Sequence, residues 1–312
     1  MPEVPADFRE LGRRLSNWGR WDTDGRRDER GTTNLLTPDR IVAAAGLVRS
    51  GKVFDLGIPF GPGGPQPGRG RINPILLRAE TGADQEHFPG AFHYADDYVF
   101  MPLQSASQWD GLAHVYYDDQ LYNGFPATDI SPHGARHLSI EHQAKGIAGR
   151  GVLIDVAGHR GVDWLAAGEV ITPEELDAVL AAQGTAIEPG DVVAVRTGWR
   201  RKFVTENDPA AFMSGEPGLG LACCEWLHAH EVAAVCSDNW AIEALPGEVD
   251  GELMPVHMVL IRDMGMTLGE ILDFEELAAD CADDGRYAFF LTAPPIKFRA
   301  GLGSPINPLA IK

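Results

Sequence analysis

The sequence has few basic residues for its size. Its 312 residues include 26 lysines and arginines against 45 aspartates and glutamates, which gives a formal net charge of -19 at pH 7. A chain with this charge repels the phosphates of nucleic acids and the headgroups of anionic lipids. We therefore expect neither a nucleic-acid partner nor a membrane partner, and a small molecule as the substrate.

Long hydrophobic runs and cysteine-rich patterns are also absent. No stretch reaches the roughly 18 consecutive apolar residues that a membrane helix needs. Residues 1–18 carry arginine and glutamate where a signal peptide has its apolar run. The four cysteines, at positions 223, 224, 236 and 281, have neither the density of a disulfide framework nor a zinc-ribbon spacing. These absences predict a cytoplasmic protein.

Motifs of several common enzyme classes are missing as well. The sequence has no GxGxxG after an expected strand, no GxxxxGK[ST], no HExxH and no GxSxG. Their absence argues against the usual nucleotide-binding folds, zincin metalloproteases and α/β-hydrolases.

The sequence does contain the pattern of a folded α/β protein, with 44% hydrophobic residues. Apolar runs at 151–156, 191–199 and 232–238 predict buried strands. Residues 171–184 and 221–230 predict helices between them. Strands that alternate with helices favour a layered α/β core.

The first fifty residues differ from this pattern. Residues 13–33 are charged and aromatic and predict an extended arm, whereas Pro38 after Thr37 predicts the start of a helix. The arm has little apolar surface of its own, so we expect a neighbouring subunit to order it in a homodimer or homotetramer. We divide the chain into an N-terminal arm and helix (1–50) and an α/β domain (51–312), with no linker between them.

A glycine- and proline-rich segment follows at residues 61–74, GPGGPQPGRGRINP. Its five glycines and four prolines exclude regular secondary structure. Two interpretations remain open here. The segment is either a surface loop or a loop that covers an active site or a subunit contact.

One short segment concentrates polar side chains that are suited to catalysis. Residues 104–114, QSASQWDGLAH, carry five such side chains around a tryptophan. Two further candidates, His257 and Glu270, lie far downstream. The candidates within the segment are Gln104, Ser107, Gln108, Asp110 and His114, together with Trp109.

This segment resembles the His-x-Gly-Thr-His-x-Asp-x-Pro-x-His motif of the cyclase family, which includes bacterial kynurenine formamidases and isatin hydrolases. Gln104 and Gln108 stand at the positions of the first two histidines. Asp110 and His114 match the aspartate and the last histidine of the motif.

The resemblance extends over roughly residues 15–312. The later histidine and glutamate of the family match His257 and Glu270. The segments NWGRWDTDGRRDERGTTNLLTP and GLGSPINPLAIK also resemble a longer-chain branch of the family. The fold that this resemblance implies is a single-domain swivelling β/β/α sandwich.

The two glutamines bear on metal binding. In the family, two imidazoles and a carboxylate hold zinc or manganese, and an amide oxygen is a much poorer zinc ligand than an imidazole. One Mn²⁺, Mg²⁺ or Zn²⁺ ion could still bind, and the site could also work without metal or be an inert polar cluster. The metal ligands implied by the resemblance are Asp110, His114, His257 and Glu270.

The resemblance implies hydrolysis of the amide or lactone carbonyl of a small cyclic or N-acyl substrate. His114 would be the general acid and base, and Asp110 and Glu270 the catalytic carboxylates. An alternative is a cyclase or dehydratase of secondary metabolism that uses the same pocket, and a third is a non-catalytic binding protein. The substrate contacts would be Gln104, Gln108 and Trp109, although core packing is an alternative role for the tryptophan.

A few other residues have two interpretations. His93 would replace a missing ligand if it lay on a neighbouring strand. Arg196 ends a buried strand, where we expect it to pair with a carboxylate or to bind a substrate anion. We expect His133, His137 and His142 on a solvated surface or at the rim of the site.

Overall fold

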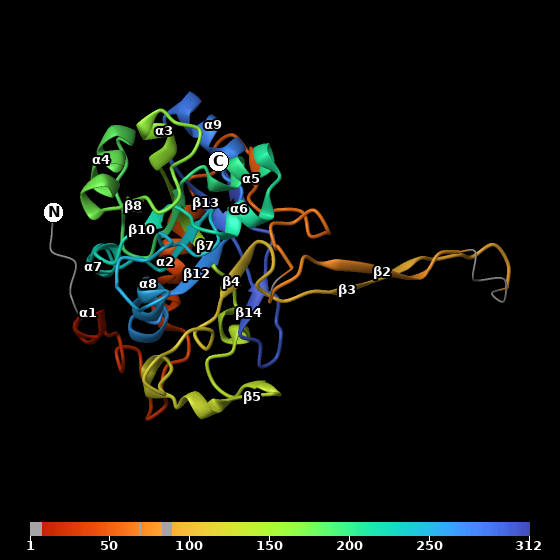
Figure 1. Ribbon diagram of the computed structural model, residues 1–312, viewed down its shortest axis with the longest axis horizontal. Coiled ribbons are helices and arrows are strands. Elements are labelled where there is room, and N and C mark those ends of the chain that lie inside the picture. Colours follow the sequence, from red (N-terminus) through yellow and green to blue (C-terminus); the bar gives the residue numbers. More distant parts are fainter. Residues whose placement is uncertain (1–7, 69, 83–88) are drawn as a thin grey trace.

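The structure is a computed structural model that describes residues 8–68, 70–82 and 89–312 (Figure 1). Within these residues, a mixed sheet of nine strands forms the centre of the fold. Four neighbouring strands, β7, β9, β11 and β12, run parallel, and every other neighbouring pair in the sheet is antiparallel. In spatial order the strands are β1 (Val53–Asp55), β15 (Leu309–Ile311), β13 (Ala288–Thr292), β7 (Ala148–Asp155), β9 (Val192–Arg196), β11 (Ala234–Ser237), β12 (Thr267–Glu270), β4 (Gln108–Asp110) and β14 (Gly303–Pro305).

The central strands are buried on both faces because apolar residues occupy both sets of alternating positions. Val152 and Ile154 of β7 pack into one apolar cluster, which we call core A. Leu153 lies between them in sequence and packs into the opposite cluster, core B. Successive side chains of a strand point to opposite faces, so a strand covered on both sides has no polar face.

Helices cover both cores. α4 and α7 pack on core A, together with α8 and the π-helical turn that continues it (Met258–Asp263), whereas α9 packs on core B. The helices are α1 (Phe8–Arg14), α2 (Pro38–Ala45), α3 (Val156–Arg160), α4 (Pro173–Gln183), α5 (Trp199–Glu206), α6 (Pro209–Met213), α7 (Cys223–Ala229), α8 (Pro255–His257) and α9 (Glu275–Asp284). None of the described helices is long and apolar enough to cross a membrane.

The α/β architecture expected from the sequence is confirmed. The three expected buried strands correspond to β7, β9 and β11, which are neighbours in the sheet. The helix expected at 171–184 is α4, in which the hydroxyl of Thr172 accepts a hydrogen bond from the backbone N–H of Glu175. Gly184 ends this helix with a φ of 61°, a conformation that glycine adopts without strain.

The N-terminal arm packs on its own chain. Leu11 and Leu15 are buried in core A. The indole Nε1 of Trp18 donates a hydrogen bond to the carbonyl oxygen of Arg262 at 2.8 Å. Apolar surface from the same chain therefore orders the arm, and the reason given for a neighbouring subunit does not hold. Homo-oligomerisation and the division at residue 50 stay predictions.

Three small two-stranded sheets complete the described part of the fold. One of them, β2 (Ile75–Glu80) with β3 (Asp96–Phe100), is a hairpin that projects from the body of the molecule (Figure 1). The others pair β8 (Val170–Ile171) with β10 (Gly218–Leu219), and β5 (Ile130–Ser131) with β6 (Gly134–Ala135).

Candidate functional site

The register of β4 and β12 brings three of the predicted site residues to one face of the sheet. The two strands are antiparallel, and Glu270 pairs with Gln108 while Leu268 pairs with Asp110. Paired residues of an antiparallel ladder share a face, and positions two apart point the same way. Gln108, Asp110 and Glu270 therefore lie on the core A side.

Trp109 lies on the opposite face. Its side chain is fully buried in core B, and its Nε1 donates to the carbonyl oxygen of Ala293 at 2.7 Å. The indole packs over Gly269, where a Cβ atom would approach it to 2.6 Å. The strand alternation that directs Gln108 and Asp110 into the site directs Trp109 away from it. This placement corrects the expectation that Trp109 contacts substrate, and its alternative role in core packing holds.

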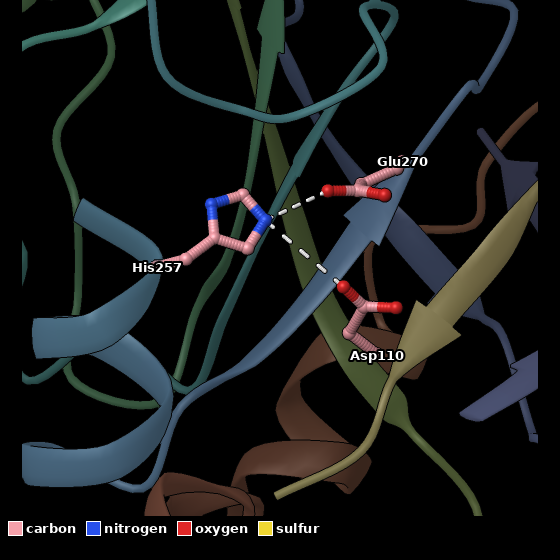
Figure 2. A group of neighbouring side chains, drawn as sticks. All are labelled: Asp110, His257 and Glu270. Atoms are coloured by element: carbon pink, nitrogen blue, oxygen red, sulfur yellow. Dashed lines mark hydrogen bonds and ion pairs between the residues drawn. The ribbon is translucent and has the colours of Figure 1, made fainter. Parts of the chain in front are cut away.

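His257 completes a buried group with the two carboxylates (Figure 2). Its Nε2 lies 3.0 Å from Oε1 of Glu270 and 4.0 Å from Oδ2 of Asp110. One ligand atom from each of the three residues lies within 4.8 Å of the other two, and all three residues are buried. His257 stands where α8 passes into a π-helical turn, a local geometry that often occurs at functional sites.

Glu243 holds His257 from the other side. Its Oε1 accepts a hydrogen bond from Nδ1 of His257 at 2.7 Å and another from the backbone N–H of the same residue at 2.8 Å. Its Oε2 accepts from the backbone N–H of Val256 at 3.1 Å. The carboxylate thus satisfies free N–H groups at the start of α8 and also fixes the imidazole with Nδ1 protonated.

The ionisable groups around His257 perturb one another strongly. Burial alone would lower the pKa of His257, but its hydrogen bonds to Glu243 and Glu270 raise it to about 10. Burial and the neighbouring Asp110 carboxylate raise the pKa of Glu270 to about 7, although His257 opposes this shift. Burial also raises the pKa of Glu216, and the charge of Glu270 adds to this shift.

The donor set fits a divalent cation. Asp110, Glu243 and Glu270 place three buried carboxylates around one imidazole, an excess of negative charge that a cation would offset. Oδ1 of Asp110 and Oε1 of Gln108 are buried without a hydrogen-bond partner in the described structure. A ligand set of carboxylate oxygens with one imidazole suits Mg²⁺ or Mn²⁺ better than a ligand set of imidazoles alone does. The buried Asp110–His257–Glu270 group could therefore hold a metal ion.

His114 lies at the accessible edge of this group. Its Nε2 is 3.6 Å from Oδ2 of Asp110, and its side chain keeps 20% of its exposure against 2% for that of Asp110. The same nitrogen lies 3.3 Å from Nη2 of Arg71. Because a guanidinium only donates hydrogen bonds, Nε2 of His114 is the acceptor and the ring is neutral. Burial, and to a lesser extent Arg71, lower the pKa of His114, while Asp110 opposes them.

The two glutamines occupy different environments. Gln108 is fully buried and donates from Nε2 to Oε2 of Glu270. Gln104 is only partly buried; its amide lies against Gly303 and its backbone carbonyl accepts a hydrogen bond from Arg71. Gln108 is thus part of the buried group, whereas Gln104 lies beside it.

The other candidates from the sequence lie outside the group. His93 is exposed in the segment that precedes strand β3, and nothing in the described structure makes it a replacement ligand. Arg196 pairs with Asp155 at 2.7 Å and with Glu275 at 2.8 Å, which is the structural role that the sequence left open.

The three histidines of the 133–142 segment are also accounted for. His133 is exposed, as expected. His137 and His142 pair with carboxylates, Asp129 at 2.8 Å and Glu29 at 3.1 Å.

Sequence reasoning missed Glu243 and Arg71. Glu243 lies in a segment with no motif, and only the fold brings it next to His257. Arg71 had a weak signal, because it belongs to the 61–74 loop for which a role over an active site was one interpretation. Its contacts with His114 and Gln104 favour that interpretation.

Comparisons with known proteins agree with this fold. A family model described as putative cyclase matches residues 54–244. A solved structure described as a novel cyclase is 40% identical, has a TM-score of 0.88, and is matched over 96% of this chain and 99% of its own. Isatin hydrolase A from Ralstonia solanacearum is 19% identical with a TM-score of 0.62, over 88% and 98% of the two chains.

A solved structure from Bacillus stearothermophilus is described as a predicted metal-dependent hydrolase. It shares the fold at 17% identity and a TM-score of 0.53, over 84% of this chain and 98% of its own. No curated protein matches the chain. The family model covers more than half of the chain, and the 40% identical structure covers nearly all of it. The chain therefore belongs to the putative cyclase family.

Proposed function

We propose that this member of the cyclase family is a hydrolase that acts on the amide or lactone carbonyl of a small cyclic or N-acyl substrate. The observation that carries the proposal is the position of His114, a neutral imidazole at the accessible edge of the buried Asp110–His257–Glu270 group. The isatin hydrolases that share the fold act on a small cyclic amide, which supports this substrate class.

His114 carries the proton transfers in this proposal. Its Nε2 accepts a proton from water as the water oxygen forms a bond to the carbonyl carbon. The same nitrogen then gives the proton to the leaving nitrogen or oxygen as the bond from that atom to the carbonyl carbon breaks. The carboxylate of Asp110, 3.6 Å from Nε2, stabilises the imidazolium between the two steps.

Asp110, His257 and Glu270 would hold a divalent cation, with Glu243 orienting the imidazole. When bound, such an ion would polarise the carbonyl group and make a water molecule more acidic. Gln108 fixes Glu270 through its side-chain amide, and its free oxygen faces no described partner.

The test is turnover of a panel of lactams, cyclic imides and N-acyl amines by wild type and His114→Asn after incubation with Mn²⁺, Mg²⁺ or Zn²⁺. A lost general acid and base costs about 10²–10⁴ in rate, so we expect the variant to lose at least about a hundredfold in kcat. Its melting temperature should be nearly unchanged. His133→Asn, on an exposed loop, is the matched control and should keep full activity. Full activity in folded His114→Asn would overturn the assignment.

Labelled water separates hydrolysis from the alternative reaction. A hydrolase incorporates one oxygen of H₂¹⁸O into the carboxylate product, whereas a cyclase or dehydratase produces an unlabelled product. Unlabelled product at full turnover would favour cyclisation or dehydration in the same pocket.

We also propose that the protein is a cytoplasmic homo-oligomer. All four cysteines are buried free thiols, as in a reducing compartment. The projecting hairpin exposes six large apolar side chains on two strands, more than a monomer surface usually carries in one place. These side chains are Ile75, Leu76, Leu77, Tyr98, Val99 and Phe100.

A second copy of the chain is the occupant we propose for this hairpin. Leu77 and Tyr98 are cross-strand partners, so Leu77→Lys with Tyr98→Glu removes apolar surface and keeps a favourable pair. Sedimentation should show an oligomer for wild type and the 33.8 kDa chain mass for the double variant. The control is Val162→Lys, at an exposed valine outside the hairpin, which should leave the mass of the sedimenting species as in wild type. A wild-type monomer at micromolar concentration would contradict the proposal.

A further inference from the structure

Arg71 reaches the site from the glycine- and proline-rich loop. Its Nη1 donates to the carbonyl oxygen of Gln104 at 3.1 Å, and its Nη2 donates to Nε2 of His114 at 3.3 Å. The guanidinium carbon lies 5.8 Å from the ring centre of Trp240. Arg71 therefore stands beside the residue to which we assign proton transfer.

The loop that carries Arg71 is fixed by its own side chains. Oδ1 of Asn73 accepts from the backbone N–H of Gln66, and Nδ2 of Asn73 donates back to the carbonyl oxygen of Gln66. Gln66 in turn donates from Nε2 to the carbonyl oxygen of Ser105 at 3.0 Å. These bonds hold the loop independently of Arg71, so the guanidinium is available for another role.

Arg71 is partly buried but forms no ion pair with any described residue. Several other partly or fully buried arginines have carboxylate partners, for example Arg150 with Asp191 and Arg196 with Asp155, whereas Arg30 and Arg40 contact backbone carbonyl oxygens away from the site. Both acceptors of Arg71 are neutral, and a guanidinium has five N–H donors. A partly desolvated cation with unused donors is costly unless a ligand supplies the missing negative charge.

We infer that Arg71 binds a carboxylate group of the substrate. This inference rests on the proposed hydrolase function and names its substrate class, a small anionic N-acyl or cyclic amide. The planar fork of a guanidinium matches a carboxylate in geometry and in charge. Because Arg71 touches His114, the carboxylate lies only a few bonds from the scissile carbonyl.

The charge of the surroundings favours a monoanion. Oδ2 of Asp110 lies 3.6 Å from Nε2 of His114, Glu270 belongs to the same buried group, and the chain as a whole has a net charge of -19. One guanidinium balances one carboxylate, whereas a phosphate dianion would leave a negative charge uncompensated next to this acidic group. The face of Trp240 beside the guanidinium offers an apolar surface for the body of the ligand.

A binding experiment tests the inference without turnover. Benzoate and benzamide have the same shape and differ in charge, and ligand-observed NMR measures weak affinities for both. We expect wild type to bind benzoate at least about tenfold more tightly than benzamide, as a charge-assisted hydrogen bond allows. Arg71→Met should abolish this preference, and Arg71→Lys should keep part of it. Equal affinities in wild type, or an unchanged preference in Arg71→Met, would overturn the inference.

A turnover experiment uses N-formylphenylalanine and its neutral primary amide, which share the scissile bond. We expect Arg71→Met to lower kcat/KM for the acid by about 10–100-fold, mainly through KM, and to change that for the amide by less than about threefold. The control is Arg49→Met, at an exposed arginine that pairs with no described residue. An equal fall in kcat for both substrates would mean that Arg71 acts on the reacting oxygen and would overturn the assignment.

The two experiments separate the inference from the proposed function. If no compound of either class is hydrolysed but benzoate binds through Arg71, the hydrolase proposal fails and the anion site stands. If both formyl compounds are hydrolysed equally well and benzoate shows no preference, the hydrolase proposal stands and the anion site fails.

Discussion

Nδ1 of His257 lies 2.7 Å from Oε1 of Glu243, and this hydrogen bond determines what the imidazole can do. A carboxylate can only accept here, so Nδ1 carries the proton and Nε2 faces Asp110 and Glu270. Metal-binding histidines commonly have such a carboxylate on their other nitrogen, where it fixes the tautomer and raises the basicity of the ligand. We therefore expect the Glu243 carboxylate to contribute to metal binding as well as to the fold.

Substitution of Glu243 should weaken metal binding. Glu243→Gln keeps the size of the side chain but removes the negative charge and turns one acceptor into a donor, which faces the N–H of Val256. Loss of such an outer partner costs about 10–100-fold in metal affinity, measured by competition with a chelating indicator. The free energy of unfolding should also fall by about 1–3 kcal/mol, because a backbone donor loses its partner.

The matched control for this substitution is Glu248→Gln. Glu248 also accepts from a backbone N–H, that of Leu221 at 2.6 Å, but it does not bond to His257. Its loss should leave metal affinity unchanged. Equal metal affinity in wild type and Glu243→Gln would show that the Glu243 carboxylate serves the fold alone.

The α/β core could be predicted from sequence because the signals are local. Apolar runs gave β7, β9 and β11 at the expected places, and Thr172 and Gly184 mark the two ends of α4 as expected. The arm could not be placed in this way. Leu11 and Leu15 bury their side chains against residues more than a hundred positions away, and no local pattern encodes such contacts.

The site was predictable only where a motif marked it. Three of the four metal ligands that the resemblance implies, Asp110, His257 and Glu270, lie together, because the register of β4 against β12 brings the two carboxylates to one face. Trp109 belongs to the same motif segment, yet strand alternation places it in the opposite core. Glu243 shows the other limit, since a lone glutamate in a loop becomes a partner of His257 only after folding.

The placement of Trp109 predicts that its substitution affects stability and leaves substrate affinity intact. Trp109→Phe leaves space over Gly269 and removes the hydrogen bond to the carbonyl oxygen of Ala293. Chemical denaturation should show a loss of about 1–3 kcal/mol in the free energy of unfolding. KM should change by less than about twofold, since the indole lies across the sheet from the site. A raised KM at unchanged stability would instead place the indole in the pocket.

Zinc affinity should rise when the missing imidazoles are restored. Gln108 already bonds to Glu270 in the buried group, and the side-chain amide of Gln104 lies against Gly303, the strand partner of Asp110. Imidazole is a far better zinc ligand than an amide oxygen, so Gln104→His with Gln108→His should raise zinc affinity at least about tenfold. Isothermal titration calorimetry with Zn²⁺ measures the change.

Gln66→His is the control for a new histidine close to the site. Gln66 is buried and contacts Ser105, but it is not part of the donor set. Its zinc affinity should equal that of wild type. Stoichiometric zinc in wild type after dialysis against a chelator would contradict the expectation of weak binding.

The pH dependence of His114 follows from its surroundings. Burial is the largest cause that lowers its pKa below the ordinary value of 6.5, and Arg71 adds to the effect. A lowered folded-state pKa means that the unfolded chain binds more protons, so this histidine makes stability fall as pH drops through 6.5. The neutral form, which the general base requires, persists below pH 6.5. The acid limb of kcat/KM should therefore lie below that value.

Arg71→Met should move this titration upward. The substitution removes a positive charge 3.3 Å from Nε2, so protonation of His114 becomes easier and its pKa rises. Arg71→Lys keeps a charge in this region and should shift the titration less. The measurement is the NMR titration of the imidazole Cε1–H signal, assigned by its absence in His114→Asn. A His114 pKa that is unchanged in Arg71→Met would show that the guanidinium does not act on the imidazole in solution.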